Sequence, residues 1–238
     1  TIIKSNITTH QPDGRVIRET RKEIQNGKQI SSYEQEYNAA WTPIKINNTT
    51  SNPESIEILD TTTGRRYKKD MTPNGSETRE ETRTGNRTTT THTSIDNTTN
   101  TETISITVTE NGNVISETRE QKQNGNTQNR RSQSYNLSWE LIALDYQDQA
   151  TGVRETIDTT TGIRRRHQPT ANGSITREET TNGTTVRQNY TVIDWTNQID
   201  SSIVTEDGDL RQRKLVEQQD GNTIRSIDQQ YDSDGNII

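Results

Sequence analysis

The chain has 238 residues, only 23% of them hydrophobic, and it lacks both Phe and Cys. This composition excludes a thick hydrophobic core, and the absence of cysteine excludes disulfides and thiolate metal sites. The 28 basic and 34 acidic residues are interspersed and leave a net charge of −6, so we expect no nucleic-acid partner. The longest apolar run is Leu141–Leu144, whereas a membrane-spanning helix needs roughly 20 residues, so we also expect no membrane span.

The glycines predict where the chain turns. All 14 follow Asn, Asp or Thr, and Asn-Gly and Asp-Gly adopt positive φ at little cost, as the two-residue turns of β-hairpins require. We therefore predict a hairpin tip at every glycine and a further turn at Asn52-Pro53. The predicted tips are Gly14, Gly27, Gly64, Gly75, Gly85, Gly112, Gly125, Gly152, Gly162, Gly173, Gly183, Gly208, Gly221 and Gly235.

Strands are predicted between these tips. The first stretch of the chain, up to residue 107, has room for about eight strands of roughly 8 to 12 residues. Ser76–Thr84 carries no apolar residue, yet its Thr, Arg and Glu side chains can form cross-strand pairs worth roughly 0.2 to 1 kcal/mol each. Thr101–Glu110 alternates Ile and Val with Ser and Thr, which is typical of a strand with one apolar face. Helices are not expected, because Thr and Asn are weak helix formers.

An internal repeat organises these elements. The phrase DTTTG at Asp60–Gly64 recurs 98 residues later at Asp158–Gly162, and the same shift aligns Trp41 with Trp139. A further copy follows at an offset of 96, because Gly208 then aligns with Gly112. Self-similarity at a fixed period is the signature of a repeat architecture. We predict two units, 1–107 and 108–203, and a partial third unit, 204–238.

The predicted fold is all-β, a tandem array of antiparallel hairpin meanders. Apolar residues gather in Ala39–Ile46, Trp139–Tyr146 and Tyr190–Trp195, so we expect some strands to pack face to face in a thin core. The polar strands should form a single-layer sheet. About 98 residues is also the size of an immunoglobulin-like domain, and tandem sandwiches of that kind are the alternative.

No residue pattern predicts catalysis or a cofactor. His10, His92 and His167 do not repeat, and their spacing shows no convergent partners, so we interpret them as surface histidines. No catalytic motif occurs, and we predict that the protein is not an enzyme. The acidic stretches Asp232–Asn236 and Glu206–Asp209 offer oxygen ligands for calcium, but they lack a distal bidentate Glu. We interpret them as ordinary Asp-Gly turns and expect no cofactor.

Ten Asn-x-Ser/Thr sequons are candidate N-glycosylation sites, provided that the protein is secreted by a eukaryote or an archaeon. A chain so rich in Asn and Thr also generates such sequons by chance, and both interpretations stay open. The ten are Asn6, Asn47, Asn48, Asn74, Asn86, Asn97, Asn136, Asn172, Asn182 and Asn189.

One short segment resembles a known family. Tyr231–Ile237, YDSDGNI, resembles the YD-repeat phrase of large extracellular or toxin-encapsulating β-hairpin shells. The alternation of glycine-tipped polar hairpins is also similar to that of spirochaetal outer-surface lipoproteins with a single-layer sheet. Both resemblances imply a hairpin array on or outside the cell.

These observations lead to a functional hypothesis. We predict a structural subunit of an extracellular fibre, sheath or surface layer that assembles with copies of itself through strand edges and terminal strands. The apolar residues Ile2, Ile3, Ile237 and Ile238 are the predicted subunit contacts. The alternative is an adhesive surface module that binds glycans or ice through threonine ladders such as Thr89, Thr91 and Thr93.

Overall fold

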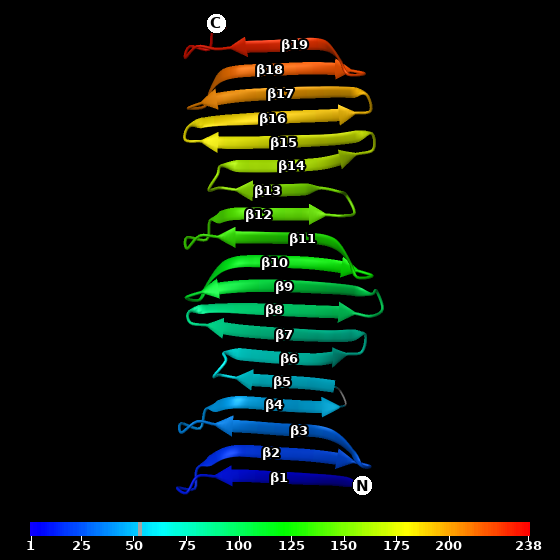
Figure 1. Ribbon diagram of the computed structural model, residues 1–238, viewed down its shortest axis with the longest axis vertical. Helices are drawn as coiled ribbons and strands as arrows, with labels where there is room; N and C mark the ends of the chain where they lie inside the picture. The colour runs from blue at the N-terminus through cyan, green and yellow to red at the C-terminus, as the bar shows by residue number, and fades with distance from the viewer. Residues whose placement is uncertain (52–53) are drawn as a thin grey trace. The chain divides into compact units, whose positions relative to one another are not determined.

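The structure is a computed structural model that describes residues 1–51 and 54–238. Over these residues the chain forms 19 β-strands and no helix, as Figure 1 shows. The predicted all-β class is therefore confirmed. None of the described residues belongs to a helix long and apolar enough to cross a membrane. The turn predicted at Asn52-Pro53 lies outside the described residues.

The chain folds as two compact units, and the first comprises Thr1–Asn126. Each of its strands pairs antiparallel with the next strand in the sequence, so the unit is a ten-stranded meander (Figure 1). The strands are β1 (Ile2–His10), β2 (Val16–Gln25), β3 (Lys28–Tyr37), β4 (Pro43–Ser51), β5 (Glu54–Asp60), β6 (Arg65–Thr72), β7 (Gly75–Thr84), β8 (Arg87–Asp96), β9 (Thr101–Glu110) and β10 (Asn113–Gln123).

The second unit, Thr127–Ile238, is built in the same way. Its strands again pair antiparallel in chain order, from β11, which begins at Asn126, to β19. They are β11 (Asn126–Tyr135), β12 (Leu141–Asp148), β13 (Arg154–Asp158), β14 (Ile163–Thr170), β15 (Gly173–Asn182), β16 (Thr185–Asp194), β17 (Asn197–Glu206), β18 (Asp209–Gln219) and β19 (Asn222–Gln230).

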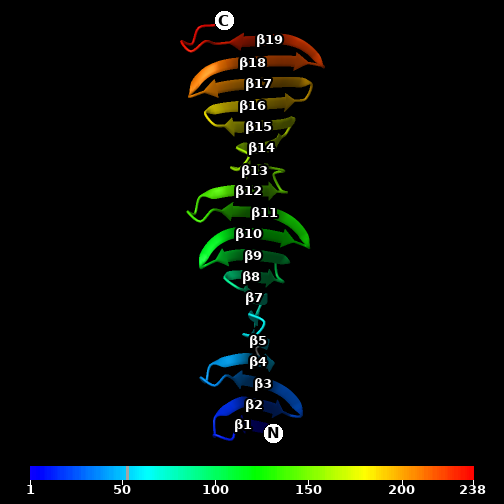
Figure 2. The same ribbon diagram turned by 60° about the vertical axis from the view of Figure 1, so that its left-hand side comes forward.

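Each unit is a single layer. Among the described residues, strands of one unit contact only their sequence neighbours. Val108, 8% exposed, is the only buried apolar side chain of the described chain. Figure 2 turns β5 and β7 of the first unit nearly edge-on, and no second layer lies beside them. Within either unit, the expected face-to-face packing and the alternative of tandem sandwiches are not found, because polar side chains stand on both faces and leave no continuous apolar surface to bury.

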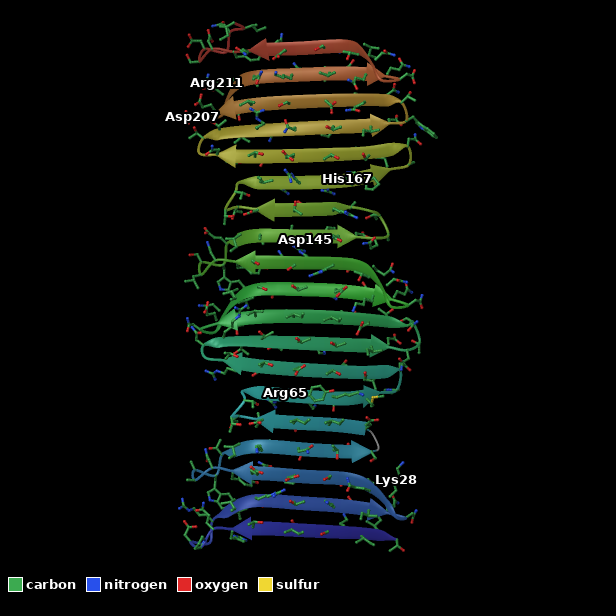
Figure 3. All side chains as sticks on the ribbon, viewed as in Figure 1. Lys28, Arg65, Asp145, His167, Asp207 and Arg211 are labelled. Carbon is green, nitrogen blue, oxygen red and sulfur yellow. The ribbon has the colours of Figure 1, made fainter. Side chains whose placement is uncertain are left out.

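Backbone ladders and polar side-chain pairs hold each layer together. Figure 3 shows side chains along every strand, among them Arg65 on β6. The Nε of Arg65 lies 3.0 Å from Oε1 of Glu80 on β7, and the Nε of Arg165 lies 2.5 Å from Oε2 of Glu178 on the neighbouring strand. Such exposed pairs contribute roughly 0 to 1 kcal/mol each. Stability must therefore rest on many small terms rather than on a core.

The turns follow the glycines, with one instructive difference. At Asn26-Gly27 both residues are left-handed, with φ of 51° and 79°, as a type I′ turn requires. Gly75 and Gly173 differ: neither lies in a turn, and each is the first residue of a strand, β7 and β15. A Cβ at Gly75 would lie 1.8 Å from the carbonyl oxygen of Ile95. Glycine is needed there because the neighbouring backbone passes too close for any side chain.

Strand bounds recur along the sequence at the predicted offset. Strands β3, β6, β7 and β8 have the same lengths as β11, β14, β15 and β16, and each pair begins 98 residues apart. Strands β9 and β17 begin 96 residues apart. The boundaries of the predicted units at 107 and 203 stay a prediction.

Candidate functional site

The outer strands of the two units leave a backbone edge open. Strand β1 pairs with β2 along one side and with no other described strand, and all nine of its residues are exposed. Ile2, Ile3 and Ile7 are 53%, 57% and 61% exposed. In the other unit β18 is the only described strand that pairs with β19. An open edge presents unpaired N–H and C=O groups, which are a template for another strand.

The predicted contacts at the other end of the chain lie beside β19. Ile237 forms an isolated antiparallel bridge with Tyr231, and the backbone N–H of Ile238 donates to the carbonyl of Gln230 at 3.0 Å. Their side chains remain 62% and 76% exposed. The isoleucine side chains are therefore available for contact, although part of their backbone is already paired.

A five-residue loop places one tryptophan in each unit on the surface. In the first unit it connects β3 to β4: the N–H groups of Ala40 and Thr42 donate to Oδ1 of Asn38 at 2.9 and 3.0 Å, and the N–H of Trp41 donates to the carbonyl of Asn38. Trp41 has a φ of 59° and is 51% exposed. Its ring lies 5.6 Å from that of Tyr37, centroid to centroid. A bulky residue at positive φ is a conformational outlier.

The same loop occurs between β11 and β12. Oδ1 of Asn136 accepts the N–H groups of Ser138 and Glu140 at 2.9 and 3.0 Å, and Trp139 has a φ of 64° and 56% exposure. Its ring lies 5.8 Å from that of Tyr135. The geometry of this loop thus repeats that of the first unit.

Comparable loops elsewhere carry glycine at the tryptophan position. In Gln11–Arg15 and Asp232–Asn236 the fourth residues are Gly14 and Gly235, with φ of 84° and 80°. Sequence reasoning did not single out the tryptophans, although a comparison of YDSDG at Tyr231–Gly235 with the Tyr-Asn-x-x-Trp segments would have shown a Trp in place of a glycine.

The third tryptophan is also left-handed and exposed. Trp195, in the turn between β16 and β17, has a φ of 51° and is 76% exposed. Every tryptophan of the chain thus lies on the surface in a conformation that costs an L-residue roughly 1 to 2 kcal/mol. Because all three tryptophans are more than half exposed, they contribute little buried apolar area to the stability of a single chain.

The three histidines lie on three different strands, β1, β8 and β14, and two of them make ordinary hydrogen bonds. His10 Nδ1 lies 2.9 Å from the carbonyl of Gly14, and His167 Nδ1 lies 3.1 Å from Oγ1 of Thr176. His92 stands on β8, opposite Arg79 of β7. Among residues 1–51 and 54–238 no group of three metal-ligating side chains gathers.

The acidic turns use their carboxylates internally. Oδ1 of Asp232 accepts the N–H groups of Asp234 and Asn236 at 2.9 and 2.8 Å, and these hydrogen bonds, that from Asn236 first, lower the pKa of the Asp232 carboxyl. Glu206 lies 3.4 Å from the Nε of Arg211, which Figure 3 labels together with Asp207. Among the described residues neither stretch gathers three metal-ligating side chains.

The sequons fall into two structural groups. Asn48 and Asn189 are half-buried within strands, and Asn136 is committed to its loop, where Nδ2 also donates to Oε2 of Glu140 at 2.7 Å. The other sequon residues are exposed, and most lie at turns or strand ends, where a glycan has room. These are Asn6, Asn47, Asn74, Asn86, Asn97, Asn172 and Asn182.

The predicted threonine ladder lies on one face of β8. Thr89, Thr91 and Thr93 stand directly opposite Val108, Ile106 and Ile104 of β9, and all three threonines are half-buried. The ladder therefore packs beside an apolar row of the same face.

One face of the second unit is hollowed over β13 to β16. The hollow has a volume of about 450 Å³ and is lined by charged and polar side chains with one tyrosine. The strand register places six of the lining residues on the same face of the sheet: Glu155, Arg164, Arg166, Arg177, Glu179 and Tyr190.

No model of a protein family matches this chain, and no curated protein is similar to it.

Proposed function

We propose that this protein is a structural subunit of an extracellular fibre, sheath or surface layer, in which copies of the chain associate through strand edges and exposed tryptophans. The single-layer fold supports the proposal. A sheet without a core leaves both faces and its outer edges in water, so contacts with further copies supply stability that one copy lacks.

The open edge of β1 supports the proposal at the level of the backbone. An added strand would satisfy its unpaired N–H and C=O groups, as in β-augmentation. Natural monomers usually protect such edges with charges, prolines or bulges. Strand β1 carries Lys4 and a register irregularity at its end, between Thr9 and His10, but it exposes three isoleucines over the rest of its length.

The observation that carries the proposal is the placement of the tryptophans. Conformational strain persists at a residue when an interaction compensates for it. Within one copy, Trp41 and Trp139 each gain a single tilted ring contact with a tyrosine, worth roughly 0.5 to 1.5 kcal/mol. Tryptophan is enriched among the residues that dominate protein interfaces, and an interface explains why these rings stay exposed.

Sedimentation velocity over a concentration series, with electron microscopy of the same samples, tests the proposal. We expect the wild-type protein, 27.1 kDa as a single chain, to form concentration-dependent assemblies. The double variant Trp41→Gly, Trp139→Gly should assemble only at higher concentration than the wild type, with unchanged circular dichroism. Asn100→Gly is the matched control, because Asn100 is also left-handed, with a φ of 51°, but offers no apolar ring. A wild-type protein that stays monomeric at high concentration refutes the proposal.

The extracellular location is implied by the resemblance of Tyr231–Ile237 to the YD-repeat phrase, and the exposed sequons are compatible with it. Intact-mass measurement of protein from its native source, before and after enzymatic removal of N-glycans, tests this part separately. A mass equal to that of the bare chain removes the support that the sequons give.

A further inference from the structure

The hollow over β13 to β16 contains two arginines that form no ion pair with a described carboxylate, although Glu155 stands opposite one of them in the strand register. Arg166 and Arg177 stand directly opposite each other on β14 and β15. Within the part of the chain that the structure describes, neither forms an ion pair. Arg177 lies over the ring of Tyr190, 5.3 Å from its centroid. Like charges directly opposite each other in a sheet are destabilising. Glu155 stands opposite Arg166 on its other side, but its carboxylate pairs with Arg164 and so offsets the repulsion between Arg166 and Arg177 only in part.

The nearby carboxylates are already engaged. Oε1 of Glu155 lies 3.0 Å from a terminal nitrogen of Arg164. Oε2 of Glu179 accepts a hydrogen bond from Nε2 of Gln188 at 2.8 Å. The hollow therefore presents two guanidinium groups beside an aromatic ring, with no described carboxylate within ion-pair distance of either.

The equivalent place in the first unit is neutralised, which shows that the fold does not require the unpaired charges. There Lys68 of β6 stands opposite Arg79 of β7. Nζ of Lys68 lies 2.8 Å from Oδ2 of Asp70, and Arg79 lies 3.9 Å from Glu81. The residue 98 positions after Asp70 is Gln168. The second unit thus has an amide in place of Asp70, whereas Glu179 occupies the position of Glu81 and binds Gln188 instead of Arg177.

We propose that Arg166 and Arg177 bind an oxyanion in this hollow. Two guanidinium groups offer planar, forked N–H donors that match a carboxylate, sulfate or phosphate group. The ring of Tyr190 borders the same space, and a sugar ring that carries such a group can stack on it. The anion replaces the missing carboxylate and removes the repulsion between the arginines. This site is independent of the assembly contacts, which lie at strand edges and loops.

Calorimetric titration of the full chain at low salt tests the site. The probes are sodium sulfate, inorganic phosphate, an oligomer of galacturonic acid and a sulfated oligosaccharide. We expect at least one probe to bind, with an affinity that falls as sodium chloride is added. Binding of the inorganic anions alone identifies a free ion as the ligand, and tighter binding of either oligosaccharide identifies an acidic glycan.

Four variants locate the binding. Arg166→Gln and Arg177→Gln should each weaken it by at least about tenfold, because each removes a charge-assisted contact. Gln168→Asp should weaken it similarly while keeping both arginines, because it restores the carboxylate of the first unit. Arg79→Gln is the matched control in the first unit and should leave binding unchanged.

Thermal unfolding separates loss of the site from loss of the fold. Arg166→Gln and Gln168→Asp should unfold at the wild-type temperature or above, because each relieves the repulsion. Absence of binding by every probe overturns the proposal, as does wild-type affinity in Gln168→Asp. Equal weakening by Arg79→Gln also overturns it, because it indicates that the anion binds arginines of the sheet without preference for this hollow.

Discussion

Replacing glycine by alanine can destabilise the fold in two ways, by backbone strain at positive φ and by a clash of the new Cβ with a neighbouring strand. Three glycines of the second unit allow the two effects to be measured separately and together. Gly183 has a φ of 59° and open space around its position, so alanine there meets only the left-handed backbone. Gly173 has an ordinary φ, but a Cβ would lie 2.1 Å from the carbonyl oxygen of Ile193. Gly162 combines both features, with a φ of 67° and a Cβ position 2.0 Å from the carbonyl oxygen of Thr181.

The structure predicts the order in which the three alanine variants lose free energy of unfolding. Left-handed backbone costs alanine about 1 to 2 kcal/mol, and reduced freedom of the unfolded chain returns about 0.4 to 1 kcal/mol. We therefore expect Gly183→Ala to lower the free energy of unfolding by roughly 1 kcal/mol. Real Cβ atoms essentially never approach within 3.0 Å, so Gly173→Ala must displace a neighbouring strand, at about 1 to 3 kcal/mol. Gly162→Ala should cost about the sum, roughly 2 to 4 kcal/mol.

Urea unfolding followed by circular dichroism measures the three free energies under one condition. Equal slopes of free energy against urea would show that the same amount of surface unfolds in each variant. If Gly173→Ala is as stable as the wild type, the close approach of the strands is wrong. If Gly162→Ala costs no more than Gly183→Ala, the two effects are not independent there.

Three further outcomes follow from single sites. A hydrogen bond from the hydroxyl of Thr160, followed by one from Thr161, lowers the pKa of the Asp158 carboxyl in the folded protein. Ionised Asp158 therefore contributes its full stabilisation of the fold above its pKa in the unfolded chain, near 4. This contribution is lost as the pH falls through the lowered pKa of the folded protein. Asp158→Asn should therefore reduce the loss of unfolding temperature between pH 5 and 2, and an unchanged pH profile would contradict this. Trp41→Gly should be about 1 kcal/mol more stable than Trp41→Ala in urea, because alanine retains the left-handed cost; equal stability would exclude that cost. Ile7→Lys should change the free energy of unfolding by less than about 0.5 kcal/mol, because the side chain is exposed, yet reduce assembly in sedimentation; full assembly would remove β1 from the interface.

Much of the strand and turn pattern was predictable from local signals. Thr101–Glu110, whose apolar alternation is visible in the sequence, is β9 without a change of bounds. Asn26-Gly27 forms the left-handed turn that its two residues favour. Both signals act within a few residues, because alternation and positive φ are properties of the local backbone.

The candidate sites were less predictable, because they depend on contacts between strands. Arg166 and Arg177 are ordinary charged residues in the sequence, and only the strand register places them opposite each other. A register displaced by one residue would put them on opposite faces. The glycine at Gly173 likewise resembles a turn signal, and only the approach of Ile193 shows its role.

The sequence by itself determined that this protein is an all-β chain of short, polar strands, because scarce apolar residues and regularly placed Asn-Gly and Asp-Gly pairs favour hairpins over helices or a core. The tertiary structure decided that within each unit the sheet stays one layer thick, that the tryptophans are exposed, and that Arg166 and Arg177 stand opposite each other without an ion pair to a described carboxylate. Those features depend on strand register and on loop conformation, which couple residues distant in the sequence through backbone hydrogen bonds.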